Sequence, residues 1–164
     1  MTLVQSRVQF VATLLCMLGM GAHATEPNRV YETNCALCHQ KDGVGLRGQF
    51  PRLAGRAAAI AATESGLHYL TEVVLFGMAG RIEVDGAQIV GVMPSFAALS
   101  DDDLASVLNY ATHLDERVSG GEKRRLITAT DVRATRAGQQ LSATQVRANR
   151  DSPILKSALG ERRK

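Results

Sequence analysis

The stretch that decides the fold is Cys35-Ala36-Leu37-Cys38-His39. It places two thiols about one helical turn apart and an imidazole directly after the second thiol. Two thioether links to a haem need thiols at this spacing, and the next residue then lies where it can bind the iron from one side. The motif therefore predicts one covalently attached haem, with His39 as an axial ligand.

Other functions of paired cysteines each lack a feature in this sequence. A zinc site needs four ligands, but residues 25–164 contain no further cysteine and only two further histidines, His68 and His113. A thioredoxin-like pair opens a helix after a strand, whereas this pair is expected to end a helix. A structural disulfide between Cys35 and Cys38 stays open as an alternative, although it gives His39 no role.

The residues that flank the motif predict short helices joined by winding loops. Pro27 favours a helix start, and the apolar spacing that follows predicts a short helix up to the motif. Residues 41–55 contain four glycines and a proline, which exclude regular structure. Further helices are expected at 57–62, at 67–76 and after Ser100, where three aspartates follow a capping serine. The apolar face of the last of these helices should meet the first helix.

A short β-hairpin is expected between two of these helices. Residues 81–90 alternate around Asp85-Gly86, which predicts a two-stranded excursion on the surface. The next stretch, residues 91–96, is expected to be irregular.

The second axial ligand has four candidates, namely Met78, Met93, His68 and His113. Met93 is the expected ligand because it follows His39 by 54 residues, which lets the chain return to the iron from the other side. The alternative is that Met93 fills a gap in the core. Met78 is expected to close the crevice, and both histidines lie among apolar neighbours on predicted helices. A thioether ligand raises the reduction potential relative to a second imidazole.

Over residues 27–116 the chain resembles class I, monohaem cytochromes c. The resemblance rests on the motif, Gly43, Gly45, residues 50–55, Met93-Pro94 and residues 100–113 with Tyr110. It implies an all-α fold in which the first and last core helices cross near the haem, with Tyr110 against Tyr31. The predicted hairpin would be a small β insertion in this fold, and the C-terminal residues a helical tail.

The resemblance also implies the residues that contact the haem, namely Cys35, Cys38, His39, Met93, Pro51 and Arg52. His39 and Met93 would bind the iron, and Pro51 would offer its carbonyl to the other nitrogen of His39. Arg52 or Arg56 would pair with a haem propionate, with an ordinary surface position as the alternative.

The first 24 residues have the pattern of a secretory signal. A basic residue precedes an apolar run over residues 8–20, and Ala22-His23-Ala24 suits signal peptidase. The run is shorter than the ~20 residues that span a bilayer. We expect cleavage after Ala24, which leaves a periplasmic protein without a stable membrane span. An uncleaved anchor and lipidation of Cys16 are the alternatives.

The C-terminal extension, residues 117–164, differs in charge from the expected cytochrome domain, residues 25–116. The domain has six basic and twelve acidic residues, a net charge of −6, whereas the extension has twelve basic and four acidic residues, a net charge of +8. Within the extension, residues 127–136 recur at a spacing of fourteen as residues 141–150, and each copy begins with a capping box. Two short helices are predicted, which are stable only when docked.

The extension contains no aromatic residue that could stack on a base, and an exported protein does not meet nucleic acid, so nucleic-acid binding is excluded. Its arginines, with Val132 and Val146, could bind the acidic face of a partner protein or fold back on the acidic domain. A solvated appendage is the third possibility.

Together these features predict a single-electron carrier and not an enzyme. Among cytochromes c the chain is most similar to small periplasmic carriers and electron-accepting subunits, so the expected partners are a periplasmic dehydrogenase or oxidase. The alternatives are a haem enzyme or gas sensor with an open sixth position, and a structural subunit.

Overall fold

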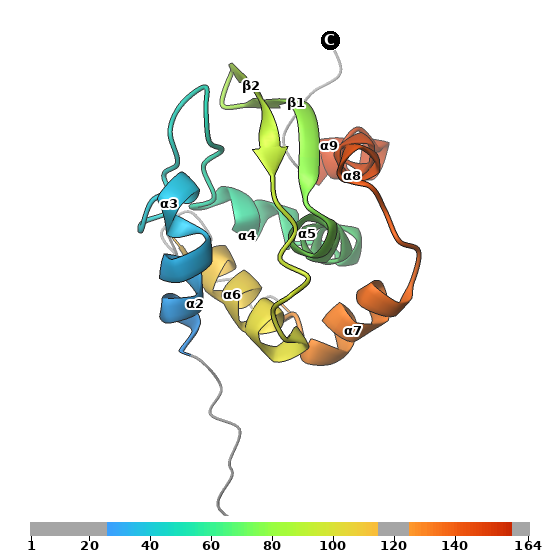
Figure 1. Cartoon of the computed structure of the whole chain (residues 1–164). Coiled ribbons are helices and arrows are strands. Elements are labelled where there is room, and N and C mark those ends of the chain that lie inside the picture. Colours follow the sequence, from blue (N-terminus) through green and yellow to red (C-terminus); the bar gives the residue numbers. More distant parts are fainter. Residues whose placement is uncertain (1–25, 115–124, 159–164) are drawn as a thin grey trace, which may run out of the picture.

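The computed structural model describes residues 26–114 and 125–158. The expected secretory signal, residues 1–24, lies outside the described residues, as does the expected junction between domain and extension. The fold is mostly helical with one small antiparallel sheet (Figure 1). Within the described ranges, no helix has both the length and the apolar character to cross a bilayer.

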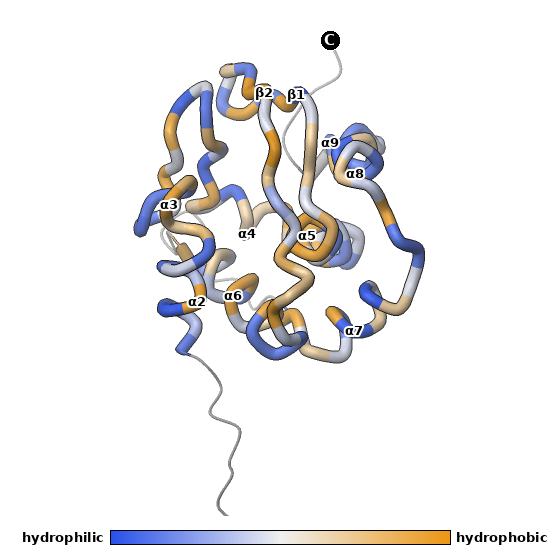
Figure 2. The backbone as a smooth tube through the Cα atoms, viewed as in Figure 1, coloured by the Kyte–Doolittle hydropathy of each residue, from blue (hydrophilic) through white to orange (hydrophobic). Residues whose placement is uncertain are grey.

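The described elements are, in chain order, α2 (Pro27–Asn34), α3 (Ala36–His39), α4 (Arg56–Ile60), α5 (Glu64–Phe76), β1 (Met78–Val84), β2 (Ala87–Met93), α6 (Asp101–His113), α7 (Ala129–Ala137), α8 (Ala143–Asn149) and α9 (Pro153–Ala158). The hydrophobic colouring is concentrated on α5 in the middle of the fold (Figure 2). This placement fits the burial of most α5 side chains.

The first and last core helices pack against each other as the sequence predicts. The first, α2, has its proline in the first turn, and α6 begins where the Ser100 hydroxyl accepts a hydrogen bond from the Asp103 amide. The rings of Tyr31 and Tyr110 lie 5.2 Å apart, centroid to centroid, where α2 meets α6. Tyr31 is fully buried, and burial raises the pKa of its hydroxyl.

The central helix starts earlier than its apolar residues suggest. The Thr63 side chain accepts a hydrogen bond from the Gly66 amide, so α5 begins at Glu64 and not at Leu67. It ends before Gly77, which has a φ of 74°. A side chain at Gly77 would place its Cβ 2.6 Å from the Met93 carbonyl oxygen, so this glycine allows the chain to return closely past the end of α5.

The hairpin is longer than predicted, and one of its two faces is buried while the other is exposed. The two strands pair from Met78 opposite Met93 to Val84 opposite Ala87, so the stretch expected to be irregular begins only at Pro94. Ile82, Val84 and Ile89 are buried, because alternate residues of both strands point to the same inward face. The β1 strand is also in contact with α8 (Figure 1).

Residues 125–158 fold back on the rest of the chain, and the solvated appendage is wrong for this part. The two predicted helices form α7 and α8, each with its capping box, and α9 is a third that the repeat does not predict. Val132 and Val146 are both 0% exposed because they pack into the hydrophobic clusters around α5. Docking supplies the stability that helices of this length lack in isolation.

Arginines of the extension bond to acidic groups of the preceding domain. The Arg136 guanidinium lies 2.9 Å from Asp101 and also donates to two carbonyl groups of the loop before α6. Arg125 pairs with Glu64 and Asp131 and holds the pKa of both carboxyl groups below their usual values. Part of the basic charge of the extension is thus paired with acidic groups of the domain.

Candidate haem site

Two adjoining cavities lie between the motif, the loop that follows it, α5 and the hairpin. Their empty volumes, which include space open to solvent, are about 850 and 740 Å³. They share the lining residues Cys35, His39, Pro51, Met78, Ile82 and Met93. The remaining lining is mostly apolar, so the two cavities form one crevice suited to a large flat hydrophobic group.

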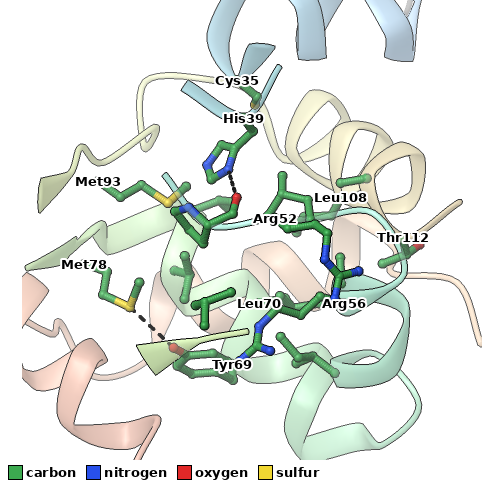
Figure 3. Close-up of a pocket in the computed structure, with 18 of the residues that line it drawn as sticks. Cys35, His39, Arg52, Arg56, Tyr69, Leu70, Met78, Met93, Leu108 and Thr112 are labelled. Carbon is green, nitrogen blue, oxygen red and sulfur yellow. Dashed lines mark hydrogen bonds between the residues drawn. The ribbon is translucent and has the colours of Figure 1, made fainter. Parts of the chain in front are cut away.

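The His39 side chain is buried in the wall of this crevice, with a ring nitrogen that could bind a metal. Its side chain is 7% exposed, and its ring points into the cavity (Figure 3). Nδ1 lies 2.9 Å from the Pro51 carbonyl oxygen, which makes Nδ1 the donor and leaves the lone pair on Nε2 for a metal. Burial lowers the pKa of His39, and the hydrogen bond to Pro51 opposes that shift.

The loop that carries Pro51 winds closely under the motif. The Gly45 amide donates to the His39 carbonyl at 2.9 Å, and Gly45 has a φ of 67°. A Cβ at Gly45 would lie 2.5 Å from the Phe50 carbonyl oxygen and 2.7 Å from that of Pro51. The absence of a side chain at this position therefore lets the Pro51 carbonyl reach the His39 ring.

Cys35 and Cys38 are partly buried and are not joined by a disulfide. Burial, with a smaller effect of Cys38, raises the pKa of the Cys35 thiol to about 11. Among the described residues, no three His, Cys, Asp or Glu side chains are grouped so that they could hold a metal ion. The thiols at the crevice wall fit thioether attachment of the predicted haem.

Both methionines reach the crevice, and they face each other across the hairpin. Met78 and Met93 are register partners at the end of the sheet, and both side chains point toward the cavity (Figure 3). The sulfur of Met78 accepts a hydrogen bond from the Tyr69 hydroxyl at 3.4 Å. Burial raises the pKa of Tyr69, so this hydroxyl remains a donor. Of the two thioethers, Met78 is thus the one with a described hydrogen-bond donor.

The other two candidates for the second ligand lie elsewhere. His68 lies 3.3 Å from the Glu72 carboxylate on the outer side of α5, and His113 bonds to the Asn109 carbonyl at 2.6 Å. Neither lines either cavity. The arrangement therefore leaves the two methionines as the side chains that could bind a metal opposite His39.

Arg52 lines the first cavity, but its guanidinium is engaged at the hairpin turn. It donates to both carboxylate oxygens of Asp85, at 2.9 and 3.1 Å, and to the Ala54 carbonyl. This ion pair lowers the pKa of Asp85. The positive φ of Asp85 marks the hairpin turn, but the sequence gives no sign that the turn returns to Arg52.

Two further lining residues are missed by the sequence analysis. Tyr69 has the spacing of a core residue on α5, and Arg150 lies in the extension, far along the chain from the motif. Arg150 reaches the cavity because α8 packs against both β1 and α5.

Comparison with known proteins places the chain in a family. The family described as cytochrome c oxidase, cbb3-type, subunit III matches residues 22–110. A cytochrome c-552 from Thermus thermophilus is 41% identical over 149 residues, which are 88% of this chain and 98% of that protein. A second Thermus thermophilus cytochrome c-552 is 44% identical over 124 residues, or 74% of this chain and 92% of that protein.

A third relative is the cytochrome c subunit of a quinone alcohol dehydrogenase from Gluconobacter oxydans. It is 35% identical over 96 residues, which are 57% of this chain but 19% of that protein. Cys35 and Cys38 fit the attachment motif of these families. This chain therefore belongs to the cytochrome c family, as a class I, monohaem electron-transfer protein that carries covalently attached haem c.

Proposed function

We propose that this chain is an exported electron carrier whose haem iron is bound by His39 on one side and Met93 on the other. The observation that carries the proposal is that both side chains point into one apolar crevice beside the paired cysteines (Figure 3). When bound, the haem supplies a one-electron iron couple, and the thioether ligand raises its potential. Cys35 and Cys38 would attach the haem, and Pro51 would orient His39.

The Tyr69 hydroxyl favours Met93 over Met78 as the ligand. It donates to the sulfur of Met78 and so holds that thioether toward Tyr69, whereas no hydrogen bond is described for the sulfur of Met93. Met78 then packs at the crevice wall, held through Tyr69. With His39 and Met93 both bound, the iron would have no open position, which would distinguish a carrier from a haem enzyme or gas sensor.

The proposed organisation is a signal at residues 1–24, a class I cytochrome fold at residues 25–116 and a basic extension at residues 117–164. The signal pattern supports a periplasmic location after export. The extension supports the fold, because its valines enter the hydrophobic clusters of the domain.

The proposed partners are a periplasmic dehydrogenase as donor and an oxidase as acceptor. One relative is a dehydrogenase cytochrome subunit, and the matching family is named for an oxidase subunit. Leu37 is 87% exposed between the two cysteines, and Val92, which lines the second cavity, is 75% exposed. Exposed apolar side chains at the edge of a redox crevice suit brief contacts with partner proteins.

The ligand assignment is tested by the optical spectrum of the purified holoprotein with and without carbon monoxide. A far-red sulfur-to-iron band in the oxidised protein, and no response of the reduced protein to carbon monoxide, are expected. Ready binding of carbon monoxide would contradict the carrier and favour an enzyme or sensor.

The partner assignment needs a separate experiment. A quinone alcohol dehydrogenase stripped of its own cytochrome subunit is mixed with the oxidised protein and an alcohol. Reduction of the haem is expected. Absence of reduction, with rapid oxidation of the reduced protein by oxidase-containing membranes, would contradict the dehydrogenase as donor and retain the oxidase.

A further inference from the structure

One side chain of the C-terminal extension enters the haem crevice. Arg150 follows α8 directly and is 5% exposed. Among the described residues that line the first cavity, it is the one that comes from residues 125–158. A buried guanidinium is costly unless charged or polar groups surround it, so the groups that face Arg150 indicate its role.

The guanidinium of Arg150 is fixed by two elements of the cytochrome domain. Nη2 donates to the Glu83 carbonyl on β1 at 2.9 Å, and the group also hydrogen-bonds to the Tyr69 side chain. The Tyr69 hydroxyl in turn donates to Met78 (Figure 3). These contacts hold the positive charge at the cavity wall beside the methionines.

The two ends of the crevice differ in chemistry. Cys38 lines only the second cavity, whereas three arginines line only the first, namely Arg52, Arg56 and Arg150. Among the described residues, neither lining contains an aspartate or a glutamate. A haem c has its thioether links on one side of the porphyrin and its two propionates on the opposite side. A haem attached at the cysteines would therefore turn its propionates toward the arginine end.

We propose that Arg150 binds a haem propionate, which makes the extension part of the redox site. A guanidinium matches the geometry of a carboxylate and keeps its charge at all relevant pH values. Neutralising a propionate removes a negative charge that favours the ferric state, so Arg150 raises the reduction potential. The proposal depends on a haem held between His39 and Met93.

Arg147, three residues earlier in α8, provides a matched control. Its Nε donates to the Arg81 carbonyl on β1, as Arg150 donates to Glu83, but Arg147 lines neither cavity. Arg150→Gln and Arg147→Gln therefore each remove a charge and a bond to the same strand. Only Arg150→Gln removes a charge from the crevice.

The test is a redox titration of the full-length holoprotein and these variants between pH 4 and 8. At pH 7, Arg150→Gln should shift the ferric-to-ferrous equilibrium about tenfold toward ferric, which is about 59 mV for one electron. Its potential should then rise as the pH falls toward about 4.3, the ordinary range of a carboxyl group. The potential and pH profile of Arg147→Gln should match those of the natural protein. Arg150→Lys should have a potential close to that of the natural protein, because it keeps the positive charge.

Equal potentials and pH profiles in Arg150→Gln and Arg147→Gln would overturn the proposal and leave Arg150 a structural role. The carbon monoxide test on each variant keeps this outcome separate from a failure of the ligand assignment. If Arg150→Gln does not fold, infrared difference spectra of the natural protein test the proposal through the ionisation of the two propionates. One propionate should stay ionised down to pH 4, and two that titrate as free carboxyl groups would overturn the proposal.

Discussion

Met78 and Met93 lie directly opposite each other in the antiparallel hairpin, and both line the two cavities of the haem crevice. The sheet register brings two chemically identical thioethers to the same place, although 15 residues separate them in the sequence. The difference between them is the Tyr69 hydroxyl, which donates to Met78. The variants Met78→Ala and Met93→Ala therefore form a matched pair.

Met93→Ala should open the iron, whereas Met78→Ala should not. Loss of the thioether ligand should abolish the far-red band, allow carbon monoxide to bind and lower the potential by on the order of 0.1 V, within the ~0.8 V that axial ligands span. Met78→Ala removes a similar buried side chain and should keep the band. Optical and redox titrations measure both, and an opened iron in Met78→Ala alone would reverse the assignment.

Gly45→Ala should destabilise the protein more than Gly48→Ala. Both residues have positive φ, so both substitutions introduce backbone strain of about 1 kcal/mol. A Cβ at Gly48 meets nothing within 4 Å, whereas one at Gly45 meets the Pro51 carbonyl at 2.7 Å. We expect a loss of unfolding free energy of about 3 kcal/mol for Gly45→Ala in denaturant titrations. Equal losses would show that the close approach to Pro51 is easily relieved.

Val132→Ala and Val146→Ala should each lower the free energy of unfolding by about 2 kcal/mol. Both side chains are fully buried where the extension docks on the domain. Val90→Ala is the control, because Val90 is exposed on β2. Denaturant unfolding followed through the haem absorbance measures all three. Unchanged stability in both tail variants would mean that the extension unfolds separately from the haem domain.

Arg125→Gln should destabilise the protein at neutral pH, and the difference from the natural protein should disappear in acid. Arg125 lowers the pKa of Glu64 and Asp131 in the folded state. Their contribution is therefore complete above the unfolded values of about 4.3 and 3.9 and is lost as the pH falls through the lower folded values. Thermal unfolding between pH 2 and 7 measures the difference.

Arg133→Gln is the control for this pH dependence, because Arg133 is exposed and lies 3.4 Å from Asp101. Its effect should be small throughout. A constant difference between Arg125→Gln and the natural protein down to pH 2 would mean that Arg125 acts through packing and not through these carboxylates.

Val92→Lys should slow electron self-exchange between oxidised and reduced molecules by about tenfold. Val92 is exposed at the crevice, where two haem edges would have to approach, and two added charges repel each other. Leu126→Lys adds the same charge at an exposed position that lines neither cavity. Magnetic resonance line broadening in mixed samples measures the rate. Equal slowing in both variants would show a net-charge effect only.

Features that depend on neighbours along the chain could be predicted from the sequence alone. The spacing of Cys35, Cys38 and His39 indicated the haem, and the capping residues Ser100 and Thr128 marked helix starts that the structure confirms. The turn at Asp85-Gly86 was also local, because a tight hairpin needs positive φ there. These features follow from helical spacing and backbone conformation, which act over a few residues.

Only the tertiary structure decided which distant residues meet at the crevice. The register of the hairpin placed Met78 beside Met93, and the return of α8 to β1 brought Arg150 to the cavity wall. For the extension, the sequence left three alternatives open: binding to a partner protein, folding back on the domain, or a solvated appendage. Its basic charge and the fourteen-residue spacing of its valines are compatible with each of them. Burial of Val132 and Val146 against α5 decided for folding back, since apolar surface is stabilised wherever complementary shape excludes water.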